Sequence, residues 1–287
     1  MIRSLPNPPA YSLMFRIYVA LFFTFLFAPL AVTCVLAFND SQFPSLPWKG
    51  ATLSWFFGDM RHRVGIFHDS VNLTSIWVSF RVAFFVTILS TLVGVCGAFL
   101  FEQENFRFKQ ALYFLMLSPL VIPGVILGIS ILLFSNTLGL FFEERWGLDV
   151  PLFRPGFWLV VLGQFSFITT LVTLIVSARL RKFDRTLEEA ALNLGATRLA
   201  VIRHVTLPFL KPAIVSAAAV AFLMSFENFN TTLFLVGSET TLPINLYLQV
   251  RDGSTPVINA ISFLLIVGTS LLAVVNLYFS RRTDGTS

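Results

Sequence analysis

Long apolar stretches, separated by shorter polar segments, are the main pattern of this sequence. Six stretches are predominantly apolar over about 20 residues or more: 15–38, 79–101, 111–134, 157–176, 213–236 and 257–279. A helix of about 20 residues crosses a bilayer core of roughly 30 Å. The pattern therefore predicts an all-α integral membrane protein, with six transmembrane helices in a single domain that covers residues 1–287.

The polar segment 178–212, between the fourth and fifth stretches, has a helical pattern of its own. Its apolar side chains recur at i, i+3, i+4 and i+7: Leu187, Ala190, Ala191 and Leu194. This spacing places them on one narrow face of a helix. Taken alone, the pattern is that of an amphipathic surface helix between two membrane spans.

Local signals set the expected ends of two helices in this segment. Thr186 and Glu189 have the spacing of a capping box, in which two side chains bond the free N–H groups at a helix start. Gly195 stands where a helix end needs a residue that tolerates positive φ. A second helical run covers 199–205, and we expect it to end at Leu207-Pro208, because proline cannot continue the hydrogen-bond ladder.

Prolines and small residues modify the second and third stretches. Ser118-Pro119 and Pro123-Gly124 predict a kink in the third stretch. Small residues recur there and in the second stretch at helical spacing: Gly124 and Gly128, and Ser90, Gly94 and Ala98. Such strips let two helices approach closely inside a membrane.

Composition indicates lipid as the solvent. The chain is 56% hydrophobic and 12% charged, with 33 phenylalanines, whereas a soluble domain carries about twice that charge. The net charge of +5 comes from basic residues scattered among loops, which argues against a nucleic-acid partner. Cys34 and Cys96 lie inside apolar stretches and indicate neither a disulfide framework nor a zinc site.

Lysine and arginine are distributed unequally over the two sides of the membrane. One side holds thirteen: Arg3, Arg16, Arg107, Lys109, Arg179, Arg181, Lys182, Arg185, Arg198, Arg203, Lys211, Arg281 and Arg282. The other holds six: Lys49, Arg61, Arg63, Arg145, Arg154 and Arg251. Arg81 falls at the edge of the second stretch. By the positive-inside rule, both termini and the segment 178–212 are expected to be cytoplasmic.

Motifs of enzyme chemistry are missing from the sequence. It contains no G-x-x-x-x-G-K-[ST] loop for ATP phosphates, no H-E-x-x-H zinc motif and no nucleophile elbow. The paired acids of an intramembrane enzyme are missing from the apolar stretches as well. We therefore expect no catalytic residue, no cofactor and no metal site.

The fourth stretch carries hydroxyl side chains at helical spacing, below Gln164: Ser166, Thr169, Thr170, Thr173 and Ser177. Two interpretations remain open. The hydroxyls can bond back to carbonyls of their own helix, which is common. Alternatively, Gln164, Ser166, Thr170 and Thr173 line a translocation path.

Glu227, followed by Asn228 and Asn230, is an acid inside the fifth stretch. A carboxylate there costs a few kcal/mol unless it faces water or a partner. Counted from Ala213, it lies about 21 Å along the helix, toward the outer leaflet. It either reaches the interface, or pairs with Arg81, or contributes with the two asparagines to the path of a cationic solute.

Fixed spacings in the segment 178–212 resemble a known motif. Glu189-Ala190-Ala191, three residues, Gly195, nine residues and then Val205-Thr206-Leu207-Pro208 resemble the EAA loop of bacterial ABC-importer permeases, with Val205 in the place of an isoleucine. In that family the short helix is a coupling helix that docks on a separate ATPase. The resemblance implies this role for Leu187, Glu189, Ala190, Ala191, Leu194, Gly195 and Pro208.

The C-terminal half resembles spermidine/putrescine-type permeases in four places: Ser225-Phe226-Glu227-Asn228, Leu233-Phe234-Leu235, Thr241-Leu242-Pro243 and Arg251-Asp252-Gly253. The resemblance implies a type I importer permease bundle in the bacterial inner membrane. It also implies a dimer of ATPases, a second permease, which we expect to form a heterodimer with this chain, and an extracytoplasmic solute-binding protein.

The expected cargo is a small organic cation such as spermidine or putrescine. Two alternatives remain: a permease for another solute, such as a ferric or opine-like ligand, and a secondary transporter driven by an ion gradient. A secondary transporter would act alone and would not need the EAA loop.

Overall fold

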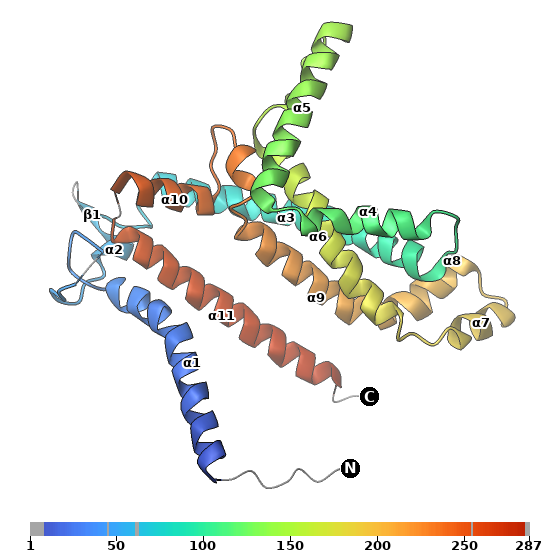
Figure 1. Cartoon of the computed structure of the whole chain (residues 1–287), viewed down its shortest axis with the longest axis horizontal. Coiled ribbons are helices and arrows are strands. Elements are labelled where there is room, and N and C mark those ends of the chain that lie inside the picture. The colour runs from blue at the N-terminus through green and yellow to red at the C-terminus, as the bar shows by residue number, and fades with distance from the viewer. Residues whose placement is uncertain (1–8, 45, 61–62, 254, 285–287) are drawn as a thin grey trace. The chain divides into compact units, whose positions relative to one another are not determined.

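The computed structural model describes residues 9–44, 46–60, 63–253 and 255–284. They fall into two compact units, Met1–Leu73 with Leu248–Ser287, and Thr74–Tyr247. Figure 1 labels the elements, which are mainly helices.

The first unit contains α1 (Pro9–Leu36), α2 (Ser54–Phe57), α11 (Val257–Asp284) and the hairpin of β1 (Asp59–Met60) and β2 (Arg63–Val64). Rings of Phe38, Phe56 and Phe263 pack together with centroids 5.0–6.0 Å apart. Trp55 adds a hydrogen bond from Nε1 to the Asn39 carbonyl, at 2.8 Å. These contacts hold the loop after α1 against the start of α11.

The second unit contains most of the remaining helices. They are α4 (Lys109–Val121), α5 (Gly124–Trp146), α6 (Phe157–Leu180), α7 (Thr186–Asn193), α8 (Arg198–Val201) and α9 (Leu207–Phe226). Two helices, α3 (Ser70–Gln103) and α10 (Leu242–Gly253), belong mostly or partly to it. Short 3-10 turns lie at Pro151–Phe153 and Thr232–Phe234, and a π-helical turn at Ile202–Thr206.

Apolar length confirms the membrane fold. Five helical runs of the described residues are long and apolar enough to cross a membrane: Tyr11–Leu36, Ser70–Gln103, Gly124–Trp146, Phe157–Leu180 and Arg198–Phe226. Val257–Leu271 is a shorter apolar helix. Each of the six predicted stretches therefore overlaps an apolar helix, and the all-α membrane fold predicted from the sequence is confirmed.

Helix α6 is the centre of the second unit. Its apolar window is 56% buried, against 6–22% for the other four long apolar runs. It packs along α9 and also contacts α4 and α5. Because lipid solvates apolar side chains as well as protein does, close packing and polar contacts decide which helices associate.

Small residues permit close packing in the second unit: those of α3 face helix α6, as the sequence predicted, whereas those of α5 face the turn after α9 and not a helix. A Cβ added to Gly94 of α3 would lie 2.6 Å from Cγ1 of Val172 on α6. Cβ atoms on Gly124 and Gly128 of α5 would lie 2.9 Å from Cβ of Asn230 and 2.6 Å from the Thr231 carbonyl oxygen. Ser90 and Ala98 are fully buried.

The third predicted stretch, 111–134, is not one helix. α4 ends at Val121, Ile122 is extended with φ −75° and ψ 129°, and α5 starts at Gly124. Pro123 explains the break, because its ring disfavours a helical conformation in the residue before it. Pro119 lies inside α4 and does not end it. The sequence predicted a kink in this stretch, and at Pro123-Gly124 the structure has a complete break between two helices.

The helix predicted at 213–236 lies nearer the N-terminus in the structure, as α9 at Leu207–Phe226. α9 ends at Phe226, and residues 227–231 form an irregular turn. Asn228 accepts hydrogen bonds from the Thr232 backbone N–H at 3.3 Å and the Thr232 hydroxyl at 2.8 Å. Such local side-chain bonds compete with the helix.

The helical run predicted at 199–205 does not end at Leu207-Pro208, where α9 begins. The helix continues from α8 through the π-helical turn Ile202–Thr206 into α9, past Pro208 and Pro212. A proline lacks the N–H of the i→i−4 ladder and its ring crowds the preceding turn. The widened π turn just before Pro208 accommodates this, so the expected helix end at Leu207-Pro208 is wrong.

Candidate functional site

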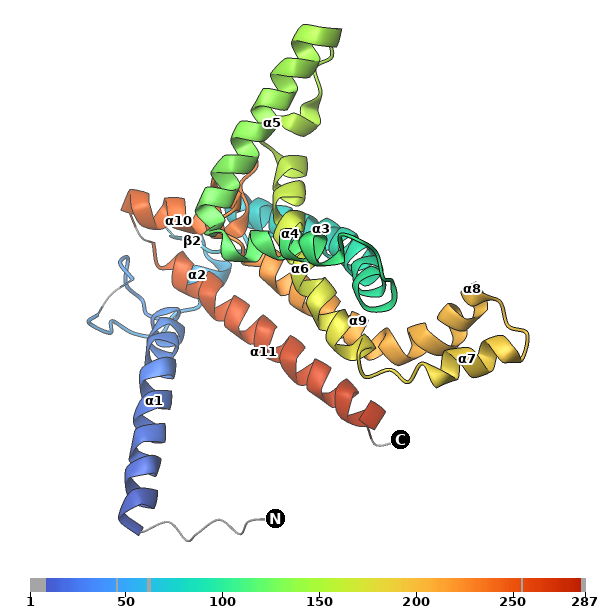
Figure 2. The same cartoon turned by 45° about the vertical axis from the view of Figure 1, so that its right-hand side comes forward.

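Helix α7 presents an apolar stripe that the rest of its unit leaves uncovered. Leu187 is 52% exposed and Leu194, just after the helix, is 89% exposed. Ala190 is exposed and Ala191 is half-buried. Figure 2 shows α7 beside α8 at the end of the α6–α9 pair. The stripe is therefore available for docking on another molecule.

Asp184, two residues before α7, bonds the first residue of the helix in the place of the capping box predicted for Thr186 and Glu189. Its Oδ1 accepts hydrogen bonds from the Thr186 backbone N–H at 3.0 Å and from the Thr186 hydroxyl at 2.8 Å. These bonds, the hydroxyl bond foremost, lower the pKa of the Asp184 carboxyl. Glu189 remains exposed, and its side chain forms no hydrogen bond or ion pair with any residue that the structure describes.

Gly195 ends α7 in the way its position predicted. Its φ is +87°, in the left-handed region. Its N–H bonds the Leu192 carbonyl at 2.9 Å, and the Ala196 N–H bonds the Ala191 carbonyl at 3.1 Å. This pair of bonds is a Schellman motif, which reverses the chain direction sharply.

The connection from α6 to α7 is tied to the end of α3. Arg181 pairs with the Glu102 carboxylate, with Nη2 and Oε1 2.8 Å apart. Arg185 donates to the Glu102 backbone carbonyl at 2.7 Å. The hydrogen bond to Glu102 raises the pKa of Arg181. Because the Arg181 side chain is 60% exposed, the pair orients the connection more than it stabilises the fold.

Glu188 makes further contacts that the sequence did not predict. Its Oε1 accepts a hydrogen bond from the Thr206 hydroxyl at 2.5 Å and a longer one from Gln103 Nε2 at 3.4 Å. It lines a pocket of about 320 Å³ together with residues from α3, α7 and α8. In sequence, Glu188 is simply a polar residue off the stripe, because its partners are 18 and 85 positions away.

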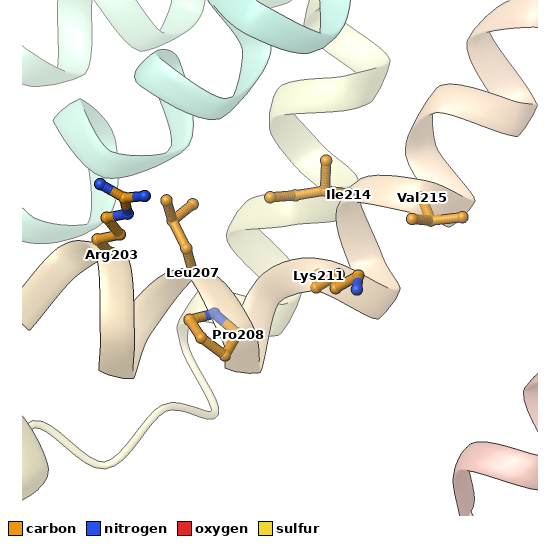
Figure 3. A pocket seen from close by; sticks show the side chains of 6 residues that line it. All are labelled: Arg203, Leu207, Pro208, Lys211, Ile214 and Val215. Carbon is orange, nitrogen blue, oxygen red and sulfur yellow. The ribbon is translucent and has the colours of Figure 1, made fainter.

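The base of α9 carries a shallow groove with a basic rim (Figure 3). Arg203 and Lys211 flank an apolar floor formed by Leu207, Pro208, Ile214 and Val215, around a volume of about 410 Å³. Arg179 lies nearby, with its guanidinium 4.1 Å from the ring centroid of Phe209. The surface around the base of α9 is therefore basic.

A buried polar cluster joins the N-terminal half of α6 to the end of α9. Gln164 is fully buried. Its Oε1 accepts a short hydrogen bond from the Ser225 hydroxyl, and its Nε2 donates to the Thr232 hydroxyl oxygen at 2.8 Å. The Thr232 hydroxyl in turn donates to Asn228. The cluster holds the turn after α9 at a fixed height on α6.

Most other hydroxyls of the α6 stripe bond back to their own helix. Ser166 donates to the Gly163 carbonyl, Thr169 to the Phe165 carbonyl and Thr173 to the Thr169 carbonyl, at 2.7–2.8 Å. Thr170 instead donates to the Met116 carbonyl of α4 at 2.7 Å. Thr170 and Thr173 are each 1% exposed, so neither faces open solvent in this structure.

Glu227 caps the end of α9 and is exposed, as is Asn230, whereas Asn228 is half-buried. The guanidinium of Arg81 lies 4.8 Å from the ring centroid of Phe157. Among the described residues no ion pair joins Arg81 to Glu227. The structure therefore does not support the pairing of these two charges.

The sequence profile of one family, the binding-protein-dependent transport system inner membrane component, matches residues 90–284. This match covers well over half of the 287 residues. The chain belongs to this family.

Three relatives are similar to this permease over much of its length. The putrescine transport system permease protein PotI of Escherichia coli strain K12 is 31% identical over 281 residues, 97% of this chain and 95% of the relative. The spermidine/putrescine transport system permease protein PotC of Haemophilus influenzae is 27% identical over 95% of this chain and 96% of the relative. The molybdenum transport system permease protein ModB of Mycobacterium bovis is 33% identical over 70% of this chain and 77% of the relative.

Solved structures show the same fold. A bacterial ABC transporter involved in the import of alginate matches with a TM-score of 0.65 at 15% identity, over 98% of this chain and 99% of that chain. The MetNI methionine ABC transporter matches with a TM-score of 0.51 at 18% identity, over 74% of this chain and 92% of that chain. The fold expected of a type I importer permease is confirmed.

Family membership establishes the general role of this permease. It is a multi-pass protein of the inner membrane and a transport subunit, not an enzyme. ATP hydrolysis in such a system belongs to a separate ATPase subunit, and a solute-binding protein is the other partner that the family implies.

Proposed function

We propose that this permease carries a polyamine, such as putrescine or spermidine, across the inner membrane in an ATP-driven importer. The relatives PotI and PotC, which this chain matches over nearly its whole length, support a polyamine. Identity alone does not decide the solute, because ModB is as similar over a shorter part of the chain.

The exposed carboxylate of Glu227 is the observation that favours a cation. The Gln164 cluster holds the turn that begins with Glu227. The rings of Phe229 and Tyr247 lie 5.0 Å apart near this turn. A carboxylate attracts an ammonium group by its charge, and the faces of aromatic rings attract cations as well. Molybdenum travels in water as an oxyanion, which the same carboxylate would repel.

In the proposed path, Glu227 and Asn230 contact the solute and Asn228 and Gln164 hold them in place. Ser166, Thr170 and Thr173 lie farther along α6. Thr170 is bound to the Met116 carbonyl of α4, so it would reach the path only when α4 moves away from α6. Alternating access supplies such a movement, since helices shift as rigid bodies between two packed arrangements.

The coupling role falls to α7. Its exposed stripe of Leu187, Ala190, Ala191 and Leu194 would dock in a groove of the ATPase, with Glu189 free for a polar contact. Gly195 and Pro208 would set the direction of the chain on either side of α8. Closure of the ATPase dimer on ATP would then move α7 and the helices attached to it.

In the assembly we propose, this chain pairs with a second, different permease subunit, and both of its termini are cytoplasmic. The basic residues Arg179, Arg203 and Lys211 around the base of α9 support this orientation, because lysine and arginine concentrate on the cytoplasmic side. That side is also where an ATPase must bind.

Reconstitution tests the proposal. The four components (this chain, its partner permease, the ATPase and the binding protein) are placed in proteoliposomes, and the uptake of labelled putrescine, spermidine and molybdate is measured with and without ATP. ATP-dependent polyamine uptake is expected. Uptake of molybdate alone would refute the cation assignment, and uptake driven by an ion gradient without ATP would identify a secondary transporter instead.

A further inference from the structure

Glu188 connects α7 to two helices that cross the membrane. Through Thr206 it reaches the base of α9, and through Gln103 it reaches the last residue of α3. The pair of Arg181 and Glu102, by contrast, ties α6 to α3 and does not reach α9. Glu188 is therefore a point at which a movement of α7 can pass directly to the base of α9.

Thr206 lies at the junction between the π-helical turn and α9, where the helix can bend. It is fully buried, and it ends the π-helical turn Ile202–Thr206 directly before α9. Single π turns inside helices often mark functional positions, and helices bend where the i→i−4 ladder is interrupted. A force applied at Thr206 thus acts at the junction where the helix that contains α8, the π turn and α9 can bend.

The contact between Glu188 and Thr206 is suited to carrying such a force. A hydroxyl that donates to a carboxylate forms one of the short, strong hydrogen bonds of proteins. Glu188 directly follows Leu187, and one residue rotates the side chain by about 100° around the helix. The carboxylate therefore turns inward while the leucine remains exposed. Docking on the stripe and holding Thr206 can occur at the same time.

We infer that Glu188 is a positioning residue that transmits the displacement of α7 to the base of α9 through the Thr206 hydroxyl. Gln103 provides a weaker second connection, to α3. The inference rests on the proposed function, because it assigns a route for the coupling between ATP hydrolysis and transport. It concerns contacts within this chain and not the surface that meets the ATPase.

The test uses Glu188→Ala, Thr206→Val and the double variant in the reconstituted transporter, with ATP hydrolysis and solute uptake measured on the same vesicles. We expect each single variant to lower the uptake per ATP hydrolysed by roughly 2- to 30-fold, the range of mutations that change coupling. In the double variant the uptake per ATP hydrolysed should fall no further than in a single variant, because both substitutions remove the same bond. Glu188→Gln keeps an acceptor and should restore part of the ratio.

Two matched substitutions control for the loss of an acid or a hydroxyl. Glu144 is an exposed acid of α5, and among the described residues the Thr137 hydroxyl bonds only its own helix, at the Leu133 carbonyl. Glu144→Gln and Thr137→Val should keep the wild-type ratio. A Glu188→Ala or Thr206→Val transporter that keeps the wild-type ratio would overturn the inference, and additive losses in the double variant would do so as well.

Failure of the proposed function can be told apart from failure of the inference. If the wild type shows no ATP-dependent uptake, the proposed function has failed. The contact is then tested by hydrogen exchange of backbone amides at 202–207 in the intact chain. Faster exchange in Glu188→Ala than in Glu144→Gln supports the bond between α7 and α9, and equal exchange overturns it.

Discussion

The hydroxyl of Ser225, near the end of α9, donates a hydrogen bond to Oε1 of Gln164, a fully buried residue in the N-terminal half of α6. The other end of the same amide donates to Thr232, beyond the turn that follows α9. One side chain of α6 is therefore bonded on both sides of the segment 226–231. This arrangement explains how a turn with an exposed acid keeps a defined position inside a membrane protein.

Replacement of the Gln164 amide should loosen this turn. Gln164→Met keeps the length of the side chain, but the buried Ser225 hydroxyl loses its acceptor and the Thr232 hydroxyl keeps only its bond to Asn228. We expect a loss of roughly 1–3 kcal/mol in stability, measured as a lower melting temperature in detergent, together with slower uptake. Gln110→Met, at an exposed amide of α4, is the control and should change neither property.

Removal of the Glu227 charge should weaken transport without affecting assembly. Glu227→Gln keeps shape and hydrogen bonding, and a hydrogen bond to a charged group is worth about 1.5–3 kcal/mol. We therefore expect the putrescine concentration for half-maximal uptake to rise roughly 10-fold. Glu239→Gln, at another exposed acid in the loop after α9, should behave as the wild type.

A second experiment separates a role in the path from a role in charge pairing. Because Arg81 lies over the Phe157 ring and forms no ion pair with Glu227 in the described structure, Arg81→Gln should not repair Glu227→Gln. Uptake kinetics of the double variant measure this. Restored kinetics would mean that the two charges neutralise each other, and Glu227 would then have no direct contact with the cargo.

Gly195→Val should uncouple ATP hydrolysis from uptake. A β-branched residue at a φ of +87° is strained by roughly 1–3 kcal/mol, so the Schellman turn after α7 should distort. The chain should still insert, because the position has open space around it. ATP hydrolysis that continues while uptake falls is the expected result, and normal uptake would exclude a coupling role for this turn.

Gly94→Ala should destabilise the packing of α3 on α6. The added methyl group would lie 2.6 Å from Cγ1 of Val172, and overpacking of this kind costs about 1–3 kcal/mol. The expected result is a lower melting temperature, partly restored by Val172→Ala in the same chain. Gly268→Ala in α11 meets open space and should have no comparable effect.

Features that depend on neighbours in the chain could be predicted from the sequence. Apolar length alone identified the membrane helices, since the bilayer sets the number of apolar residues that a span needs. Gly195 and the stripe of α7 were likewise predictable, because a helix end and a helix face are set by residues within about two turns. The EAA loop is also a local pattern, and its fixed spacing was enough to indicate the family.

Features that depend on contacts between distant residues required the tertiary structure. Gln164 and Glu188 acquired their roles from partners 61–85 positions away or across the π turn at Thr206. Polar groups in a buried site must find partners wherever the fold places them, and a sequence pattern along one helix contains no record of that placement.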